Sequence, residues 1–137
     1  MTASRSQAGF TLIELLMVLA IVITLATIAI PQYQKYIAKG NRGDGISAIQ
    51  NILVAQERYF TDHMAYTTDL SKLGSGLATS ERGMYTLAAA ACSSSIPLTQ
   101  CVKITATALG KQSADGNLVA TSQGAQYRLV GGQQEKW

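Results

Sequence analysis

The sequence contains few of the residues that carry chemistry in enzymes. It has one histidine and two cysteines in 137 residues. A zinc site needs about four such ligands at suitable spacing, so His63 is interpreted as a surface residue. The serine run at 93–95 has no histidine or acid at a spacing that a hydrolase would use. We therefore expect no enzyme activity, no catalytic residue, no metal and no cofactor.

A strong basic excess and a phosphate-binding loop are also missing. The net charge is +3, or +2 once the single charge of Arg5 is removed, which is far below the excess of most nucleic-acid binders. The glycine-rich stretch 40–45 lacks the lysine and the serine or threonine that end a phosphate loop. Arg42-Gly43-Asp44 matches a tripeptide that some adhesion receptors bind, but so short a match means little inside a predicted helix. The charges predict a mixed, solvated surface.

The sequence does have one long apolar segment near its N-terminus. Residues 1–9 are small and polar, and between Phe10 and Ile30 the only charged residue is Glu14. A bilayer core about 30 Å thick needs about 20 apolar helical residues. The run is longer than the apolar part of a secretory signal peptide, and no small-residue cleavage site follows it. It therefore predicts a membrane-spanning helix.

Beyond this run the helical pattern continues but becomes amphipathic. An apolar stripe at helical spacing is formed by Ile46, Ile49, Leu53 and Phe60. Pro31 removes a backbone donor, and the glycines between 40 and 45 each weaken a helix by about 1 kcal/mol relative to alanine. We expect one helix from about residue 10 to residue 60 that kinks at Pro31 and bends or locally melts between Pro31 and Gly45.

Short segments of strand character fill the C-terminal half. They lie at residues 84–91, 102–108, 118–121 and 127–130. Turn residues separate them, which is typical of an antiparallel meander. A sheet of about four strands needs a cover on one face, and the apolar stripe of the helix can provide it. The predicted fold class is α+β. Residues 63–76 predict a loop anchored by Tyr66 and Leu70, and residues 131–137 a loose tail.

The start of the apolar run carries a specific motif. Residues 9–18 resemble the processing signature of type IV pilins and pseudopilins, with the sequence GFTLIELLMV. Residues 29–33, which end the apolar run at a proline, are also similar to that family. The segments 57–60 and 66–70 look like the helix end and following loop of the minor-pilin branch often called PilE-like.

The resemblance implies a processing and assembly route. A prepilin peptidase would cut between Gly9 and Phe10, and Phe10 would be N-methylated. Residues 1–9 would then be the leader, 10–31 the transmembrane and filament-core helix, and 32–137 the head, including the amphipathic half of the helix. The subunit would wait in the inner membrane with its head in the periplasm. An inner-membrane assembly platform would add it to an extracellular type IV pilus with other pilin subunits, for adhesion, twitching motility or DNA uptake.

Glu14 is unusual on physical grounds alone. A carboxylate in the bilayer core costs about 2.5–3.5 kcal/mol on insertion scales. Two explanations are open from the residues: the carboxylate could lie near the headgroups, where a helix start favours negative charge, or it could neutralise an amine during assembly. The resemblance favours the second, because cleavage after Gly9 would leave a free amine on Phe10 that Glu14 of a neighbouring subunit could pair with.

Cys92 and Cys101 are the only cysteines. In an exported chain such a pair predicts one disulfide, whereas in a cytosolic chain it predicts two free thiols. The N-terminal segment indicates export, so we expect a Cys92–Cys101 disulfide. Closing so short a loop should contribute about 3 kcal/mol. The two-residue spacing of a redox pair is absent.

Three other functions remain as alternatives to a pilus subunit. A secretion-system pseudopilin of this family often carries an acidic calcium loop near the C-terminus, but only Asp115 and Glu135 follow Glu81 as acids. A DNA-binding competence pilin would show a basic stripe beside the disulfide. The residues that could form it are Lys103, Lys111 and Arg128. An anchored enzyme would need a catalytic constellation. The sequence favours a pilus subunit, minor rather than major.

Overall fold

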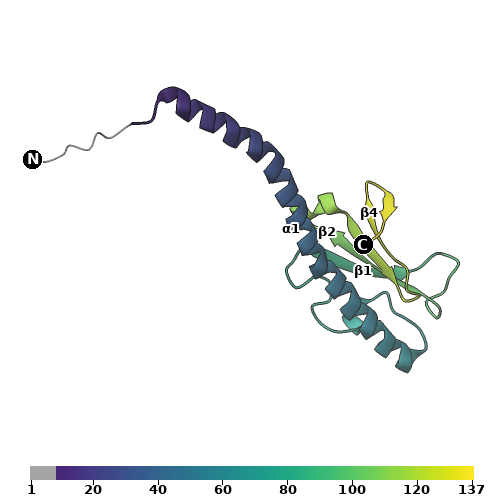
Figure 1. Ribbon diagram of the computed structural model, residues 1–137. Helices are drawn as coiled ribbons and strands as arrows, with labels where there is room; N and C mark the ends of the chain where they lie inside the picture. Colours follow the sequence, from purple (N-terminus) through teal and green to yellow (C-terminus); the bar gives the residue numbers. More distant parts are fainter. Residues whose placement is uncertain (1–8) are drawn as a thin grey trace, which may run out of the picture. The chain divides into compact units, whose positions relative to one another are not determined.

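The computed structural model describes residues 9–137, so the predicted leader lies outside the described part except for Gly9. The chain divides into two compact units that meet between Tyr36 and Ile37. We call residues 9–36 the stem unit and residues 37–137 the head unit. Helix α1, Leu12–His63, runs through both (Figure 1).

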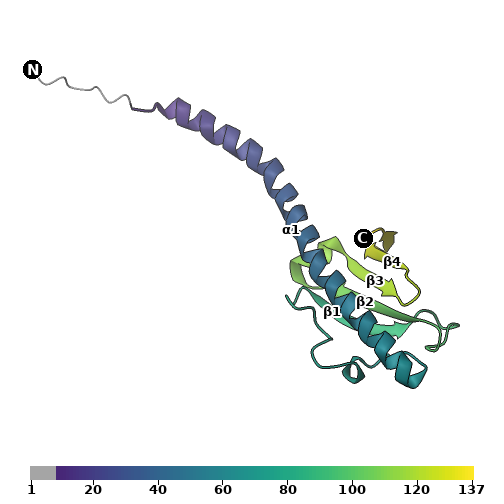
Figure 2. The same cartoon turned by 60° about the horizontal axis from the view of Figure 1, so that its bottom comes forward.

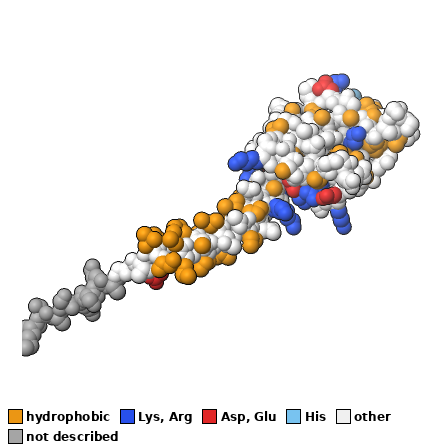
Figure 3. All heavy atoms as spheres, turned by 90° about the horizontal axis from the view of Figure 1, so that it is seen from above, with side chains coloured by type: hydrophobic (Ala, Val, Ile, Leu, Met, Phe, Trp, Pro, Cys, Tyr) orange, Lys and Arg blue, Asp and Glu red, His pale blue; other side chains and the backbone are white. Residues whose placement is uncertain are grey.

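The stem unit is one apolar helix without a core of its own. Its large apolar side chains between Phe10 and Ile30 are 48% to 86% exposed, and they cover the stem in Figure 3. The hydroxyl of Thr24 donates to Ala20 O at 2.8 Å, and that of Thr27 donates to Thr24 O at 2.7 Å. Both polar groups are thus satisfied inside the helix, as a lipid environment requires. By length and composition α1 can cross a membrane.

The helix is continuous where the sequence allowed a break. It passes through Pro31 and the glycines at 40, 43 and 45 without leaving the helical conformation. Of the two alternatives expected between Pro31 and Gly45, a bend or local melting, local melting is therefore wrong. Contacts within the head unit explain part of this, because Gln112 and Asp115, from a connection between two strands, bind α1 at Ala38 and Arg42. A kink at Pro31 stays a prediction.

The head unit is a five-stranded antiparallel sheet covered on one face by the second half of α1 (Figure 2). The strands are β1 (Tyr85–Ala91), β2 (Val102–Ala108), β3 (Asn117–Thr121), β4 (Gln126–Val130) and β5 (Gln133–Glu135), in that spatial order. Two short 3-10 helices, η1 (Leu70–Lys72) and η2 (Gly110–Asp115), lie in the connections. The α+β class and the meander are confirmed, with four strands close to their expected positions.

The core lies between the helix stripe and the sheet. Ile49 and Ile52 are fully buried and pack with Tyr85, Ile104 and Leu118 from the strands. The expected neighbours Ile46 and Leu53 are partly buried against this cluster, as are the loop anchors Tyr66 and Leu70. The predicted stripe is confirmed at Ile46, Ile49 and Leu53, and both anchors are confirmed. Phe60 is not part of this cluster, and its ring instead contacts that of Tyr66, with centroids 4.7 Å apart.

Gly45 allows the helix to approach the sheet closely. A Cβ at this position would lie 2.8 Å from Leu118 Cδ1 and 2.8 Å from Tyr85 Cδ2. Real Cβ atoms do not come so near, so a side chain would force the helix and sheet apart. Gly43 lies two residues before Gly45 in the same helix, and a Cβ there would have open space around it. The two glycines therefore have different roles, although both weaken the helix alike.

A polar residue completes the buried stripe. Gln56 is fully buried, and its side-chain amide donates to Thr67 O at 2.6 Å while its oxygen accepts from Thr67 N at 3.0 Å. These two bonds fasten the loop after α1 to the helix and satisfy a buried amide. The sequence analysis did not single out Gln56, although it lies seven residues after Ile49 on the same face.

The C-terminal segment is not a loose tail. Gly131 and Gly132 both have positive φ, 58° and 83°, and they form a two-residue turn that pairs β5 with β4. Such turns favour glycine because its backbone adopts positive φ without strain. The indole nitrogen of Trp137 donates to Tyr127 O at 2.5 Å. The Gly-Gly pair after β4 is the signal that the sequence analysis missed.

Candidate functional site

The predicted cleavage site lies just before the helix. Gly9 and Phe10 are outside any regular element, and Phe10 is 86% exposed. Thr11 occupies the position before the first helical residue, and its hydroxyl accepts from Glu14 N at 3.3 Å. Thr11 thus acts as an N-cap. This cap keeps the two residues at the predicted cut in an open, non-helical conformation. Cleavage and methylation stay predictions.

Glu14 lies in the first turn of α1 and is exposed. Negative charge is favoured there by the helix dipole. Since Thr11 already caps this turn, the Glu14 carboxylate is not needed as a cap, and among residues 9–137 it has no ion pair within 4.0 Å. The position fits both explanations of Glu14, so the assembly role stays a prediction.

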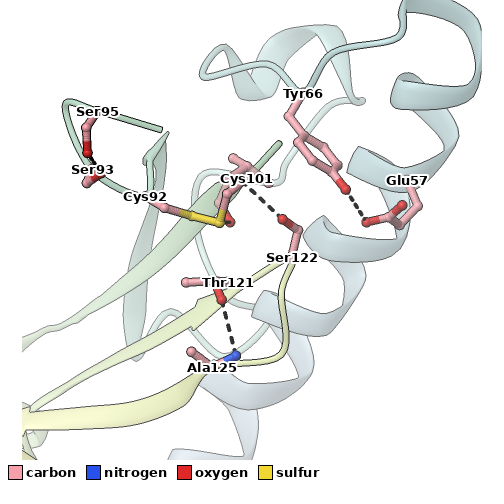
Figure 4. Close-up of a disulfide and its surroundings, with 10 residues drawn as sticks. Glu57, Tyr66, Cys92, Ser93, Ser95, Cys101, Thr121, Ser122 and Ala125 are labelled. Atoms are coloured by element: carbon pink, nitrogen blue, oxygen red, sulfur yellow. Dashed lines mark hydrogen bonds between the residues drawn. A yellow bond between two sulfur atoms is a disulfide. The ribbon is translucent and has the colours of Figure 1, made fainter. Parts of the chain in front are cut away.

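The disulfide joins the ends of the β1–β2 connection. Cys92 and Cys101 are bonded, with their Cα atoms 5.7 Å apart. Nearby, Tyr66 N donates to Leu98 O at 3.0 Å, which holds the disulfide loop against the segment after α1. Figure 4 shows the Tyr66 hydroxyl pointing at the Glu57 carboxylate, to which it donates at 2.9 Å. Burial, and then this bond to Glu57, raise the pKa of Tyr66. The expected disulfide is present as a staple of this end of the head unit.

A cluster of paired charges lies near the other end. Asp115 accepts two hydrogen bonds from Arg42, at 2.8 and 2.6 Å, and one from Arg128 Nη1 at 2.9 Å. The three side chains are 9%, 12% and 19% exposed respectively. Arg128 also pairs with Glu135 on β5. Hydrogen bonding to Asp115 raises the pKa of Arg42, so the arginine stays charged.

Because Arg42 belongs to this cluster, its guanidinium is not free to bind an adhesion receptor. Its guanidinium is bound to Asp115, and Oδ1 of Asp44 accepts from Arg82 N at 3.1 Å. The Arg42-Gly43-Asp44 tripeptide is therefore part of the folded helix and its packing. These contacts support the expectation that the tripeptide match has little meaning as a receptor-binding motif.

The three basic residues that could have formed a stripe, Lys103, Lys111 and Arg128, do not share one face. Strand register aligns Arg128 with Leu118, whose side chain faces the helix, while Lys103 alternates with buried Val102 and Ile104 and so faces the opposite side. Lys111 lies beyond the far end of β2, and the strand from Lys103 to that end is about 17 Å long at about 3.3 Å per residue. The suggestion that the three share one face is wrong, because the register and the pairing with Asp115 separate them.

A different basic surface lies at the end of α1. A groove of about 610 Å³ is lined by Ala55, Arg58, Tyr59, Asp62, His63, Lys72 and Leu73. The rings of Tyr59 and His63 stack, with centroids 3.9 Å apart and planes 4° apart. Tyr59 O accepts from His63 Nδ1 at 3.0 Å, which fixes the proton on that nitrogen. We call this surface the distal groove.

Local hydrogen bonds position the part of the distal groove that lies outside α1, which is formed by Lys72 and Leu73. Asp69 caps η1 by accepting from Ser71 N at 3.0 Å and from the Ser71 hydroxyl at 2.6 Å. These bonds lower the pKa of Asp69, so its carboxylate is ionised at neutral pH. The cap orients the turn that carries Lys72. Within the described residues, neither Lys72 nor Arg58 forms an ion pair, so both charges are available to a ligand.

Sequence reasoning missed the distal groove. The sequence indicates only a surface position for His63, and Arg58 and Tyr59 lie within the helix-end segment 57–60 of the resemblance. The four-residue spacing of Tyr59 and His63 is the available signal, since such residues are neighbours on a helix. Residues 9–137 contain no group of three His, Cys, Asp or Glu side chains that could hold a metal ion.

An apolar N-terminal helix with a processing motif, joined to a helix-covered antiparallel sheet, defines the class of type IV pilins. Residues 4–30 match the prokaryotic N-terminal methylation motif. Residues 31–128 match the family described as "Type IV minor pilin ComP, DNA uptake sequence receptor". The chain belongs to this family of minor pilins, which are filament proteins.

Several fimbrial proteins are similar in sequence. The chain is 37% identical over 79 residues to the type IV major pilin protein PilE of Neisseria gonorrhoeae, covering 58% of this chain and 47% of that protein. It is 32% identical over 108 residues to the fimbrial protein EcpC of Eikenella corrodens, covering 77% and 69%. It is 35% identical over 82 residues to a fimbrial protein of Dichelobacter nodosus, covering 60% and 51%. The match thus spans about half of PilE.

These findings confirm the prediction that the chain is a pilin, and they also confirm the predicted choice of a minor over a major subunit. They also favour the DNA-binding competence pilin, which the sequence analysis held as an alternative because the net charge is small. Net charge does not describe how the basic residues are distributed, since Arg42 and Arg128 form internal ion pairs while Arg58 and Lys72 line the distal groove. The apolar helix is consistent with membrane anchoring followed by pilus assembly.

Proposed function

We propose that this chain is a minor pilin that binds DNA through its distal groove and presents it for uptake by a type IV pilus. The observation that carries the proposal is the groove itself. It combines two cationic side chains that form no ion pair within residues 9–137, Arg58 and Lys72, with the stacked rings of Tyr59 and His63. The membership of a family described as a DNA uptake sequence receptor supports the same ligand.

The groove has the chemistry that a DNA backbone and its bases require. Arg58 and Lys72 can bind phosphate oxygens, and each such contact releases counterions from DNA. An aromatic pair at the rim offers a surface on which an exposed base can stack. Asp62 also lines the groove and repels phosphate, so it restricts the path that the backbone can take. Phosphate binding is thus directed to the sides where Arg58 and Lys72 lie.

Processing and assembly would place the groove outside the cell. We propose that the precursor is cut after Gly9 and methylated on Phe10, and that the stem unit then anchors the subunit in the inner membrane with the head unit in the periplasm. Incorporation into a filament through the stem units of several pilins would follow. The family's methylation motif at residues 4–30 supports this order.

The test is DNA binding by the full-length protein in detergent. Binding of a labelled mixed-sequence duplex is measured at several salt concentrations for the wild type, an Arg58→Gln/Lys72→Gln double variant and a Lys103→Gln control. We expect the double variant to lower the salt slope by about 2, or about 1 for each lost phosphate contact. The control should leave the slope unchanged, because Lys103 lies on the opposite face of the sheet.

A second variant tests the aromatic pair. Tyr59→Ala removes the partner of the His63 ring without changing charge. It should therefore weaken binding of a labelled single strand, whose bases are free to stack, while leaving the salt slope intact. An unchanged salt slope in the double variant, or an equal loss in Lys103→Gln, would contradict the assignment of DNA binding to the distal groove.

A further inference from the structure

We propose that the distal groove takes an unpaired nucleotide, as at a frayed or single-stranded DNA end. The inference rests on the proposed function and names the form of DNA that the groove selects. The base of this nucleotide stacks on the ring of His63 and donates a hydrogen bond from its amino group to Asp62. Its phosphate binds Arg58 or Lys72.

The stacked pair at the end of α1 leaves one ring face open. The ring of Tyr59 covers one face of the His63 ring, with centroids 3.9 Å apart and planes 4° apart. The helix ends at His63, so no further turn covers the other face. Thr67, four residues on, lies outside the helix, where its backbone is bonded to the side chain of Gln56. Since His63 is exposed, its open face can receive a second flat group.

Only some forms of DNA can offer a flat group to this ring. Inside a duplex both faces of a base pair are covered by the neighbouring pairs, and only the edges of the bases are accessible in the grooves. An unpaired base can turn one face outwards and stack on an aromatic side chain. The open face of His63 therefore favours an unpaired base over the interior of a duplex.

Stacking decides which form of DNA binds more tightly. Two Lys or Arg side chains line the groove, Arg58 and Lys72, whereas a protein that follows a duplex commonly makes roughly 6–10 phosphate contacts. Both forms of DNA supply phosphates, so these contacts do not discriminate between them. A base stacked on an aromatic side chain strengthens binding by about 5- to 140-fold, and only the unpaired form provides it.

The groove has the size of one nucleotide. Its volume is about 610 Å³, and cavities of about 300–1,000 Å³ hold small-molecule ligands. Its lining on α1 runs from Ala55 to His63, which is about 12 Å of helix. A nucleotide can lie along this length with its base at the His63 end.

Asp62 gives the groove a preference among bases. It lines the groove and is exposed, and it forms no ion pair within residues 9–137. A carboxylate accepts hydrogen bonds from the amino group of cytosine, and both hydrogens of that group are free in an unpaired base. Thymine has no amino group. The carboxylate that repels phosphate thus attracts an unpaired cytosine.

The first experiment measures the preference for unpaired DNA. Full-length protein in detergent binds a labelled mixed-sequence single strand at neutral pH. The unlabelled strand, its blunt-ended duplex and the same duplex with a single-stranded overhang then compete for the protein. We expect the strand and the overhang duplex to compete about tenfold better than the blunt duplex. His63→Ala should bring this ratio near one, whereas His63→Phe keeps a flat ring and should preserve it.

A second experiment tests the role of Asp62. Strands of six cytosine or six thymine nucleotides are compared, and the wild type should bind the cytosine strand about fivefold more tightly. Asp62→Ala removes a repulsive charge and should raise the affinity for both strands. It should also make the two affinities equal, whereas a carboxylate that only repels phosphate would leave their ratio unchanged.

The controls separate this inference from the proposed function. Arg58→Gln/Lys72→Gln should weaken all competitors alike, and Lys103→Gln should change neither ratio. Equal competition by all three competitors in the wild type, loss of the preference in His63→Phe, or an unchanged cytosine-to-thymine ratio in Asp62→Ala would each overturn the inference. Those results would leave DNA binding by the groove intact. The proposed function fails instead if the double variant binds as tightly as the wild type.

Discussion

The apolar side chains of helix α1 are exposed in the stem unit and buried along one stripe in the head unit. In the stem unit these side chains cover every side of the helix and stay exposed, with Leu16 at 52% and Ile28 at 64%. In the head unit a single stripe is buried, and Ile49 and Ile52 are completely covered by the sheet. An apolar surface of the first kind needs lipid or other helices around it. The second kind is satisfied within one chain.

The difference separates what each part contributes to a pilin. The stem unit carries no packing of its own, so its interactions are with the membrane and then with other subunits. The head unit has a core, a disulfide and a cluster of ion pairs, so it can keep its surface grooves in shape in both environments. A substitution in the stem should therefore affect assembly, and one in the head should affect folding.

The largest expected effect tests this division in the stem. Glu14→Val should abolish or strongly reduce incorporation into filaments, because the Phe10 amine would lose its partner, and an unpaired charge in an apolar core costs several kcal/mol. Membrane insertion should be intact or improved, since the only charge in the span is gone. The measurement compares this protein in sheared filaments and in membranes. Glu14→Asp should be intermediate.

Two outcomes would count against this role for Glu14. Normal incorporation of Glu14→Val would mean that the carboxylate only favours the helix start near the headgroups. Loss of cleavage at Gly9 would mean that it acts in processing. The melting temperature of the head unit should not change in either variant, because Glu14 belongs to the other unit.

The next largest effect tests the self-sufficiency of the head. Asp115→Asn should destabilise it by about 3 kcal/mol, because Arg42 and Arg128 would share a mostly buried site without their common carboxylate. Thermal unfolding of the full-length protein in detergent, followed by near-ultraviolet circular dichroism, gives the change. Asp69→Asn is the control. It keeps a capping side chain on an exposed residue and should cost under about 0.5 kcal/mol. Similar losses in both would contradict a structural role for the Asp115 cluster.

A third test uses two glycines in the same helix. Gly45→Ala should cost about 1 kcal/mol, since overpacking against Tyr85 and Leu118 exceeds the gain in helix propensity. Gly43→Ala should instead stabilise the head by up to about 1 kcal/mol, because nothing lies within 4 Å of the added Cβ. Unfolding of both variants under the same conditions measures the difference. A shift of the same sign in both would mean that the helix relaxes away from the sheet at Gly45.

Much of this fold follows from local patterns in the sequence. The first four strands alternate or are β-branched and are bounded by turn residues, so they could be placed within a residue or two. Strand β5 could not be found by hydrophobic alternation, because Gln133–Glu135 is entirely polar. It exists because a Gly-Gly turn returns the chain along β4 and because Trp137 bonds to Tyr127.

Long-range polar contacts account for the rest. Arg42 and Asp115 are 73 residues apart, and no local pattern indicates that they pair. The stripe that Lys103, Lys111 and Arg128 could have formed failed for the same reason, since only the strand register determines which face Arg128 occupies. The disulfide could be predicted because only two cysteines exist. The distal groove could not be predicted, because it joins the end of α1 to Lys72 of η1 and to Leu73 after it.

The smallest expected effect concerns the two ends of α1. The helix is preceded by a capping residue, Thr11, and it is followed at its other end by Met64, which has a φ of 55° and is 70% exposed. Met64 N donates to Phe60 O at 2.8 Å, so the residue ends the helix in the left-handed conformation that favours glycine. Met64→Gly should remove this strain and stabilise the head by about 0.5–1 kcal/mol, after the greater chain entropy of glycine is subtracted. Met64→Ala is the matched control, because it deletes the exposed side chain but keeps the strain, so its melting temperature should match the wild type. An equal gain in both variants would show that the exposed methionine side chain, and not the backbone, lowers stability at this end.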